Sequence, residues 1–185
     1  MIRNIFVCSL LSVVFVFSAC NSGNKDETKD DRQLLMAKID SIQKNMFDKK
    51  NQELNKDLAF KGITTYQEFV KKFPEDTAHS PEYLFRTSDL LRAVGDNGKA
   101  ILTLAQLCKD YPKYKKIPEA LFLQGYYYQE FFNDTSSAKD CYNKLIAQFP
   151  SHAFSADAKA MMKNFGKTDE QIIKEFEAKN AQKKK

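Results

Sequence analysis

The chain has 185 residues, with 15 Phe, 8 Tyr, no Trp and a formal net charge of +5 at pH 7. This length is enough for one domain with a buried core, and the phenylalanines and tyrosines supply bulky apolar side chains for it. The basic residues are not interleaved with exposed aromatic residues, which argues against nucleic acid as a partner.

The first 19 residues are typical of an export signal. Arg3 is the one charged residue among them, and the run from Ile5 to Ala19 carries no charge. That run is shorter than the about 20 residues that a membrane-spanning helix needs. We therefore predict a signal peptide over residues 1–19.

A cysteine, Cys20, follows the apolar run directly after Ser18 and Ala19. Small residues before a cysteine resemble the lipobox of bacterial lipoproteins, in which the cysteine is lipidated and becomes the first mature residue. The resemblance implies that acyl chains such as palmitate on Cys20 anchor the protein to a membrane leaflet. An ordinary secretory signal followed by a chance cysteine is the alternative.

The segment 20–31 is polar and predicts a flexible tether. Asn21 stands where an Asp would resemble an inner-membrane retention signal, so we expect the outer membrane. Lys25-Asp26-Glu27 is similar to the surface-export signal of Bacteroidetes lipoproteins, whereas the other interpretation is a solvated tether alone. The periplasmic face and the cell surface therefore both stay open.

Three aromatic–proline pairs then recur at intervals of 38 residues: Phe73-Pro74, Tyr111-Pro112 and Phe149-Pro150. A fixed period of this size is typical of stacked helical repeats. Such arrays usually present a binding surface rather than a catalytic pocket. Proline cannot continue a helix, so each pair predicts a helix end.

Each proline is preceded by one small and two large residues at steps of three or four, which places them on one helical face. The small residue allows close approach of a neighbouring helix, and the large ones fill the groove beyond it. The small residues are Gly62, Ala100 and Ala138, and the large ones are Tyr66, Leu104, Tyr142, Phe69, Leu107 and Leu145.

A second helix is predicted before each of these segments. Ser80 is predicted as the cap of a helix that begins Pro81-Glu82-Tyr83, and Pro118-Glu119-Ala120 repeats the pattern 37 residues on. Turns separate the two helices of each pair. We expect the caps of the second helices among Asp96, Asn97, Asp134 and Thr135.

The series Gly125, Tyr128, Ala138, Tyr142, Leu145 and Pro150 resembles the tetratricopeptide repeat family. The period of 38 exceeds the family's about 34 because the loop after each proline is longer. That longer loop is similar to the BamD and CpoB group of outer-membrane lipoproteins, over about residues 57–165. The resemblance implies an all-α helical-hairpin repeat solenoid of about three helix pairs and a terminal capping helix.

The segment 32–55 carries Leu35, Ile39, Ile42 and Met46 in a 4-3-4 spacing, followed by Leu54. We predict the first helix of the first pair here, packed on residues 57–73. A coiled-coil stem for self-association is the alternative, although barely two heptads are present.

At the other end we predict a helix from Ser155 to Lys163, with Ala156, Ala160 and Met161 inward, which Asn164-Phe165-Gly166 ends. Thr168-Asp169-Glu170-Gln171 is a capping-box pattern that starts a last helix. Its apolar residues, Ile172, Ile173 and Phe176, are expected to face the stack and cap it.

The repeat domain is thus predicted over 32–178, followed by a basic tail at 179–185. We interpret this tail as a soluble helix end, and a weak contact with acidic head groups or anionic polysaccharide is the alternative.

Sites for chemistry are few. His79 and His152 lie in loops without ligand spacing around them, so we expect no metal, no cofactor and no enzymatic activity. Cys108 and Cys141 occupy different phases of their repeats, which favours two free thiols over a disulfide.

An aromatic cluster at Tyr126, Tyr127, Tyr128, Phe131 and Phe132 covers too much of a helix to be buried entirely. One interpretation buries Tyr128 with some of its neighbours. The other places Tyr126, Tyr127 and Phe131 on a partner-binding surface, which Tyr111 and Tyr114 extend along the loop edge.

We therefore predict a lipid-anchored, protein-binding scaffold of the bacterial cell envelope, whose partners are envelope proteins. A role in outer-membrane protein assembly follows if the likeness to BamD extends to function. The alternatives are a surface-exposed ligand-binding lipoprotein and a division coordinator of the CpoB kind.

Overall fold

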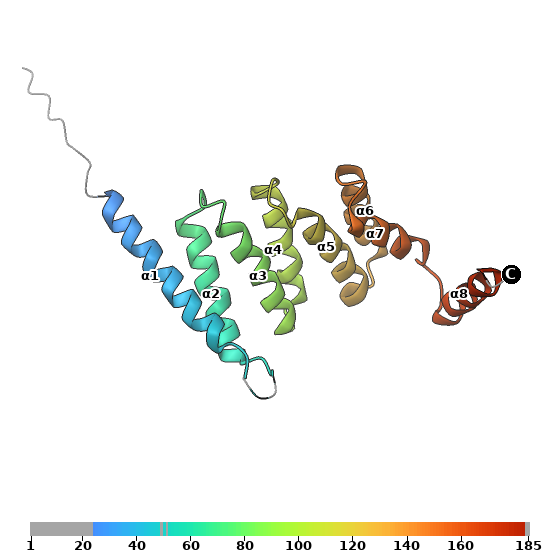
Figure 1. Ribbon diagram of the computed structural model, residues 1–185, viewed down its shortest axis with the longest axis horizontal. Coiled ribbons are helices and arrows are strands. Elements are labelled where there is room, and N and C mark those ends of the chain that lie inside the picture. The colour runs from blue at the N-terminus through green and yellow to red at the C-terminus, as the bar shows by residue number, and fades with distance from the viewer. Residues whose placement is uncertain (1–23, 49, 51, 184–185) are drawn as a thin grey trace, which may run out of the picture.

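The computed structural model describes residues 24–48, 50 and 52–183. The predicted signal peptide and Cys20 lie outside this range. Within it the chain forms eight α-helices, and a single isolated antiparallel bridge joins Phe47 to Leu54 (Figure 1). The helices are α1 (Asn24–Asn45), α2 (Lys56–Lys72), α3 (Ser80–Ala93), α4 (Asn97–Asp110), α5 (Ile117–Phe132), α6 (Thr135–Gln148), α7 (Ala153–Lys163) and α8 (Asp169–Lys183).

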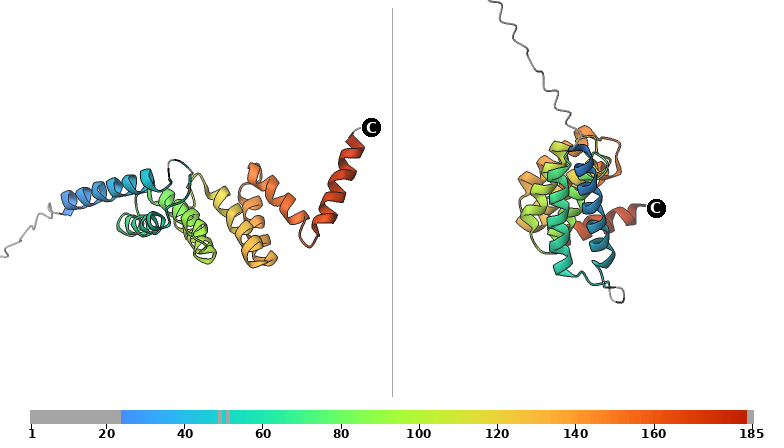
Figure 2. Two further views of the ribbon diagram at one scale, coloured as in Figure 1. Left: turned by 90° about the horizontal axis from the view of Figure 1, so that it is seen from below. Right: turned by 90° about the vertical axis from the view of Figure 1, so that its left-hand side faces the viewer.

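From α1 to α7 each helix packs on the next, so that α1–α2, α3–α4 and α5–α6 form three successive hairpins. Figures 1 and 2 show them as one row of helices. The predicted all-α helical-hairpin solenoid is confirmed.

The small-large-large pattern forms the core, as predicted. Ala100 and Ala138 are fully buried, as are the large residues at the two following positions of each repeat. At Gly62 an added Cβ would lie 2.9 Å from Cε of Met46, so the small residue allows α1 to approach α2 closely. Tyr128, predicted as part of the core, is half-buried and packs against it.

The three repeat prolines are an exception to the predicted core. Pro74, Pro112 and Pro150 are exposed. The helices end two residues before the prolines, and the C-cap residues between, Phe73, Tyr111 and Phe149, donate their backbone N–H groups to the last turn. Each proline therefore opens a loop instead of filling the interior.

The first helix packs on α2 as expected. Leu35, Ile39, Ile42 and Met46 are buried, and they pack within the chain's own core. Helix α1 begins at Asn24, inside the segment 20–31 that was expected to be a flexible tether. The helix therefore starts closer to Cys20 than the sequence predicts.

Two helix caps agree with prediction and one does not. Asp96 and Asp134 cap α4 and α6 by accepting hydrogen bonds from the N–H groups of Lys99 and Ser137. Ser80 is instead the first helical residue of α3, fully buried, and its hydroxyl donates to the carbonyl oxygen of Phe73 at 2.7 Å. The prediction of Ser80 as the cap is wrong because the hydroxyl bonds backward to the preceding loop.

Helix α7 has a different inward face from the one predicted. Ser155 and Ala158 are buried, while Ala156 and Ala160 are exposed and Met161 is half-buried. The Ser155 hydroxyl donates to the carbonyl oxygen of Phe149 at 2.6 Å, which fixes the rotation of the helix.

Helix α8 lies beyond the row and does not cap it (Figures 1 and 2). Thr168 and Gln171 form the predicted capping box, at 3.0 and 3.4 Å. However, Ile173 and Phe176 are 56% and 65% exposed, so the prediction that they face the stack is wrong. Phe176 stands one 38-residue period after Ala138, so the position that requires a small residue carries a bulky one.

In the part of the chain that the structure describes, we find no helix with the length and apolar character to cross a membrane.

Candidate partner-binding surface

The loops that follow the helix-ending aromatic residues lie along one side of the row, together with the start of α1 (Figure 1). We call the segments 73–79, 111–116 and 149–152 the proline-loop edge. Each connects the second helix of one hairpin to the first helix of the next. The edge therefore runs across all the repeats.

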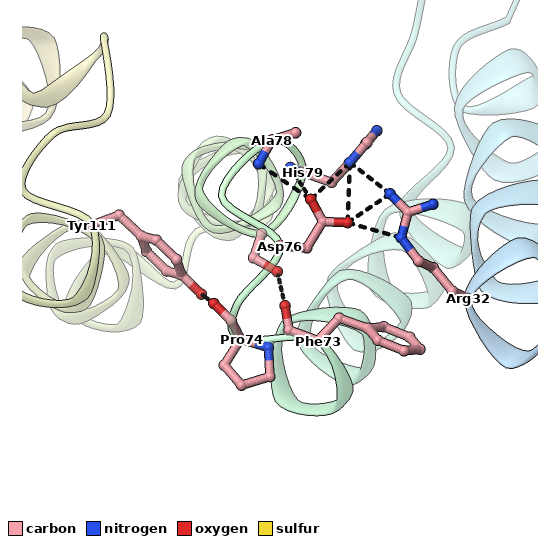
Figure 3. A network of polar contacts seen from close by, with 8 residues as sticks. Arg32, Phe73, Pro74, Asp76, Ala78, His79 and Tyr111 are labelled. Carbon is pink, nitrogen blue, oxygen red and sulfur yellow. Dashed lines mark hydrogen bonds and ion pairs between the residues drawn. The ribbon is translucent and has the colours of Figure 1, made fainter. Parts of the chain in front are cut away.

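The first of these loops is fixed by Asp76 (Figure 3). The Arg32 guanidinium on α1 donates from Nε and Nη2 to Oδ2 of Asp76, at 2.9 and 2.7 Å. The N–H groups of Ala78 and His79 donate to Oδ1 at 3.1 and 3.0 Å, and Nδ1 of His79 lies 2.9 Å from the same oxygen. This one carboxylate thus joins α1, the loop and the start of α3.

These contacts also set the acidity of Asp76. Partial burial disfavours the charged carboxylate, but the hydrogen bonds from His79 and Arg32 outweigh it and hold the pKa of Asp76 below its usual range. The carboxylate is therefore ionised and compensated.

Tyr111 connects the first loop to the second. Its hydroxyl donates to the carbonyl oxygen of Pro74 at 2.8 Å (Figure 3). Burial raises the pKa of Tyr111, so the hydroxyl keeps the proton that it donates. The ring consequently stands between the two loops.

Tyr114, three residues further along the same loop, connects this loop to α3. Its hydroxyl donates to Oε2 of Glu82 on α3, and Lys116 lies 3.2 Å from the same oxygen. Arg86 bonds the other oxygen of Glu82 at 2.8 Å. Burial raises the pKa of Glu82, but these donors outweigh it and the pKa stays below its usual range. Burial and the neighbouring carboxylate both raise the pKa of Tyr114.

Two cavities open on either side of Tyr111. One, of about 610 Å³, lies between the ends of α2 and α4. The other, of about 600 Å³, lies between the two loops. Tyr111 and Asp110 line both cavities. The first is also lined by Gln67, Val70, Lys71, Pro74, Leu84 and Gln106, and the second by Thr77, Ala78, Pro81, Pro112, Lys113, Tyr114 and Lys115.

Residues 119–152, which span most of α5, all of α6 and the loop after it, match the family described as tetratricopeptide repeat. This segment of the chain is therefore similar to one tetratricopeptide repeat. No curated protein matches the chain. Hairpins α1–α2 and α3–α4 stack in the same way as the matched repeat, and tetratricopeptide arrays serve as scaffolds for protein–protein contacts.

Within the matched repeat, the structure corrects the prediction for Tyr127. Its side chain is only 2% exposed, so it belongs to the core and not to a partner-binding surface. Burial and the charge of Asp89 raise the pKa of Tyr127. Tyr127 stands 37 residues after Leu90, which is also buried, so the spacing between Pro81 and Pro118 already predicts its inward position.

The remaining predicted aromatic residues are not on one surface. Tyr126 is half-buried against Tyr127, with ring centroids 6.1 Å apart. Phe131 is 41% exposed, but it lies near the end of α5 opposite the proline-loop edge. Fourteen residues of helix separate Phe131 from Ile117, which is about 21 Å at 1.5 Å per residue. Only Tyr111 and Tyr114 share a surface.

Sequence reasoning missed the residues that complete this surface. Thr77 and Pro81 line the second cavity from one loop, and Lys113 and Lys115 line it from the other. A signal was present, because the long loop after Pro112 alternates lysine with tyrosine. A loop lengthened relative to the family's usual repeat is a place where binding residues accumulate.

Cys108 and Cys141, the two cysteines within the described residues, are free, as predicted. Both line a smaller cavity of about 230 Å³, where Gln124 donates to Sγ of Cys108 at 3.4 Å. Burial raises the pKa of Cys108 to about 11, so its thiol is protonated at neutral pH. Among the described residues no cluster of three or more His, Cys, Asp or Glu is arranged to hold a metal ion.

Proposed function

We propose that this protein is a lipid-anchored scaffold of the bacterial cell envelope that binds an extended segment of a partner protein along the proline-loop edge. The observation that carries the proposal is the pair of cavities on either side of Tyr111. Each is of the size at which side chains or small ligands bind. Together they form a row of sites across two consecutive repeats.

The rigidity of the edge supports this role. Tyr111, Tyr114 and Asp76 are each held by hydrogen bonds to a neighbouring element. A surface that is ordered before binding loses less conformational entropy when a partner is bound. The edge is therefore better suited to capturing a segment than a set of unconstrained loops.

The proposed anchor lies on the same side. Three residues separate Cys20 from Asn24, the first residue of α1. Because an extended chain spans at most about 3.5 Å per residue, Asn24 lies within about 14 Å of Cys20. Helix α1 starts on the side of the proline-loop edge (Figure 1), so we infer that this edge is oriented toward the membrane.

The cellular setting rests on the resemblance of the N-terminal segment and of the long repeat loop to Bacteroidetes outer-membrane lipoproteins. Within that setting we propose a role in outer-membrane protein assembly. A surface-exposed ligand-binding lipoprotein and a division coordinator of the CpoB kind are the competing roles. Protease treatment of intact cells distinguishes a surface location from a periplasmic one, because a periplasmic protein survives the treatment.

A photo-crosslinking experiment tests the binding surface. A benzophenone amino acid replaces Thr77, an exposed residue that lines the second cavity, or Thr64, an exposed residue on α2 outside both cavities. We expect a reproducible membrane-protein adduct from position 77 and none of the same mass from position 64. Equal adducts from both positions, or none from position 77, would contradict the proposal.

The anchor has its own test. Cys20→Ala is expected to move the protein from the membrane fraction to the soluble fraction and to abolish incorporation of labelled palmitate. A variant that remains in the membrane fraction would exclude lipidation at this residue.

A further inference from the structure

Two lysines, Lys113 and Lys115, flank the cavity of about 600 Å³ at the proline-loop edge. Both side chains are exposed, and within the described residues neither takes part in an ion pair or a side-chain hydrogen bond. They contrast with Lys116 in the same loop, which pairs with Glu82 at 3.2 Å. Two positive charges are thus left at the rim of the cavity.

Two of the carboxylates nearby, Asp76 and Glu82, are already compensated within the chain. Asp76 is bound by Arg32 and His79. Glu82 is bound by Tyr114, Arg86 and Lys116. Among the residues that line this cavity, Asp110 is the single carboxylate, against two lysines. The lining is therefore positively charged overall.

The wall between the lysines is largely apolar. Pro81 and Ala78 contribute from one side, and Tyr111, Pro112 and Tyr114 from the other. The Tyr111 hydroxyl donates to Pro74 and the Tyr114 hydroxyl donates to Glu82. The ring surfaces of the two tyrosines are therefore left to form the wall. Such a site accepts an apolar side chain in the middle and negative charges at the rim.

We propose that this cavity binds an extended polypeptide segment that carries aspartate or glutamate. Its carboxylates pair with Lys113 and Lys115, and an apolar side chain between them enters the cavity against Tyr111 and Pro81. In an extended segment successive side chains point to opposite faces, so alternating residues fit this arrangement. The inference rests on the proposed scaffold function and specifies the chemistry of the partner.

Because the two lysines are exposed, their interactions with a ligand are screened by salt. Binding of an acidic segment should therefore be strongly salt-dependent. We expect at least a tenfold weakening between 50 and 500 mM salt. A segment held by apolar contacts alone would show no such loss.

The test uses the full chain and three fluorescein-labelled decapeptides in which valine alternates with glutamate, glutamine or lysine. Fluorescence anisotropy is expected to show the glutamate peptide binding at least tenfold more tightly than the glutamine peptide at 50 mM salt. The double variant K113E/K115E should abolish this preference. K61E/K139E changes the net charge equally at exposed lysines outside the cavity and should retain it.

Equal affinity for the glutamate and glutamine peptides, or no binding of any peptide at 1 mM, would overturn the inference. So would an undiminished preference in K113E/K115E. The scaffold function is judged separately by the adduct from position 77. If that adduct forms equally in wild type and in K113E/K115E, the scaffold stands and the acidic partner is excluded, whereas absence of the adduct contradicts the scaffold itself.

Discussion

The hydroxyl of Tyr111 donates a hydrogen bond of 2.8 Å to the carbonyl oxygen of Pro74, which lies one repeat earlier. Both residues come from aromatic–proline pairs, so the same sequence feature that ends each helix also connects successive loops. The bond fixes the ring between two cavities. The geometry of the candidate binding surface therefore depends on contacts between repeats.

Replacing Tyr111 by phenylalanine tests this connection. The variant keeps the ring and loses the hydrogen bond, and an intramolecular hydrogen bond typically contributes about 1 kcal/mol. We expect the free energy of unfolding in urea to fall by about that amount. Tyr126→Phe is the matched control, because no hydrogen bond from that hydroxyl is found within the described residues, and it should have a smaller effect.

A pair of glycine substitutions tests the packing within the repeat. At Gly125 an added Cβ would lie 2.5 Å from Cε1 of Tyr142, whose ring is fully buried and has little freedom to move. Gly125→Ala should therefore destabilise the protein by about 1–3 kcal/mol. At Gly98 the closest atom is 3.9 Å away, on Phe132, so Gly98→Ala should be neutral or slightly stabilising. Thermal unfolding of the two variants measures the difference, and equal losses would contradict the close approach at Gly125.

Most of the fold followed from the period of 38 residues. The positions of Gly62, Ala100 and Ala138, and of the large residues after them, depend on local helical spacing, which a sequence shows directly. Helix ends were predictable for the same reason, since proline and capping aspartates act within one turn. These features need no knowledge of distant contacts.

The errors arose where a contact beyond a single helical turn decides the outcome. Ser80 and Ser155 bond backward to carbonyl oxygens of the preceding loops, which sets the start of α3 and the rotation of α7. Tyr127 is buried because α5 repeats the register of α3, so its inward position follows from comparing the two helices and not from the three adjacent tyrosines alone. The candidate surface combines residues from two loops, so neither loop alone identifies it.

The pH dependence of stability provides a test of the Asp76 network. The pKa of Asp76 is lowered in the folded state, so its stabilising contribution is present above the pKa of the unfolded chain and is lost as pH falls through the folded value. Asp76→Asn should be less stable than wild type at pH 5, and the difference should shrink steadily toward pH 2. Urea midpoints of both proteins across this range give the measurement. If the stability difference between wild type and Asp76→Asn stayed constant with pH, ionisation of the Asp76 carboxylate would contribute nothing to stability.

Removal of α8 tests whether the array is complete without it. Ile173 and Phe176 are exposed, so ending the chain after Thr168 removes little buried surface and should leave the urea midpoint nearly unchanged. Ending it after His152 also removes α7, whose Ala158 is fully buried and whose Ser155 bonds to Phe149. That shorter chain exposes the end of the core formed by α5 and α6, and its midpoint should fall markedly. A large loss on removing α8 alone would show that this helix packs on the array in solution.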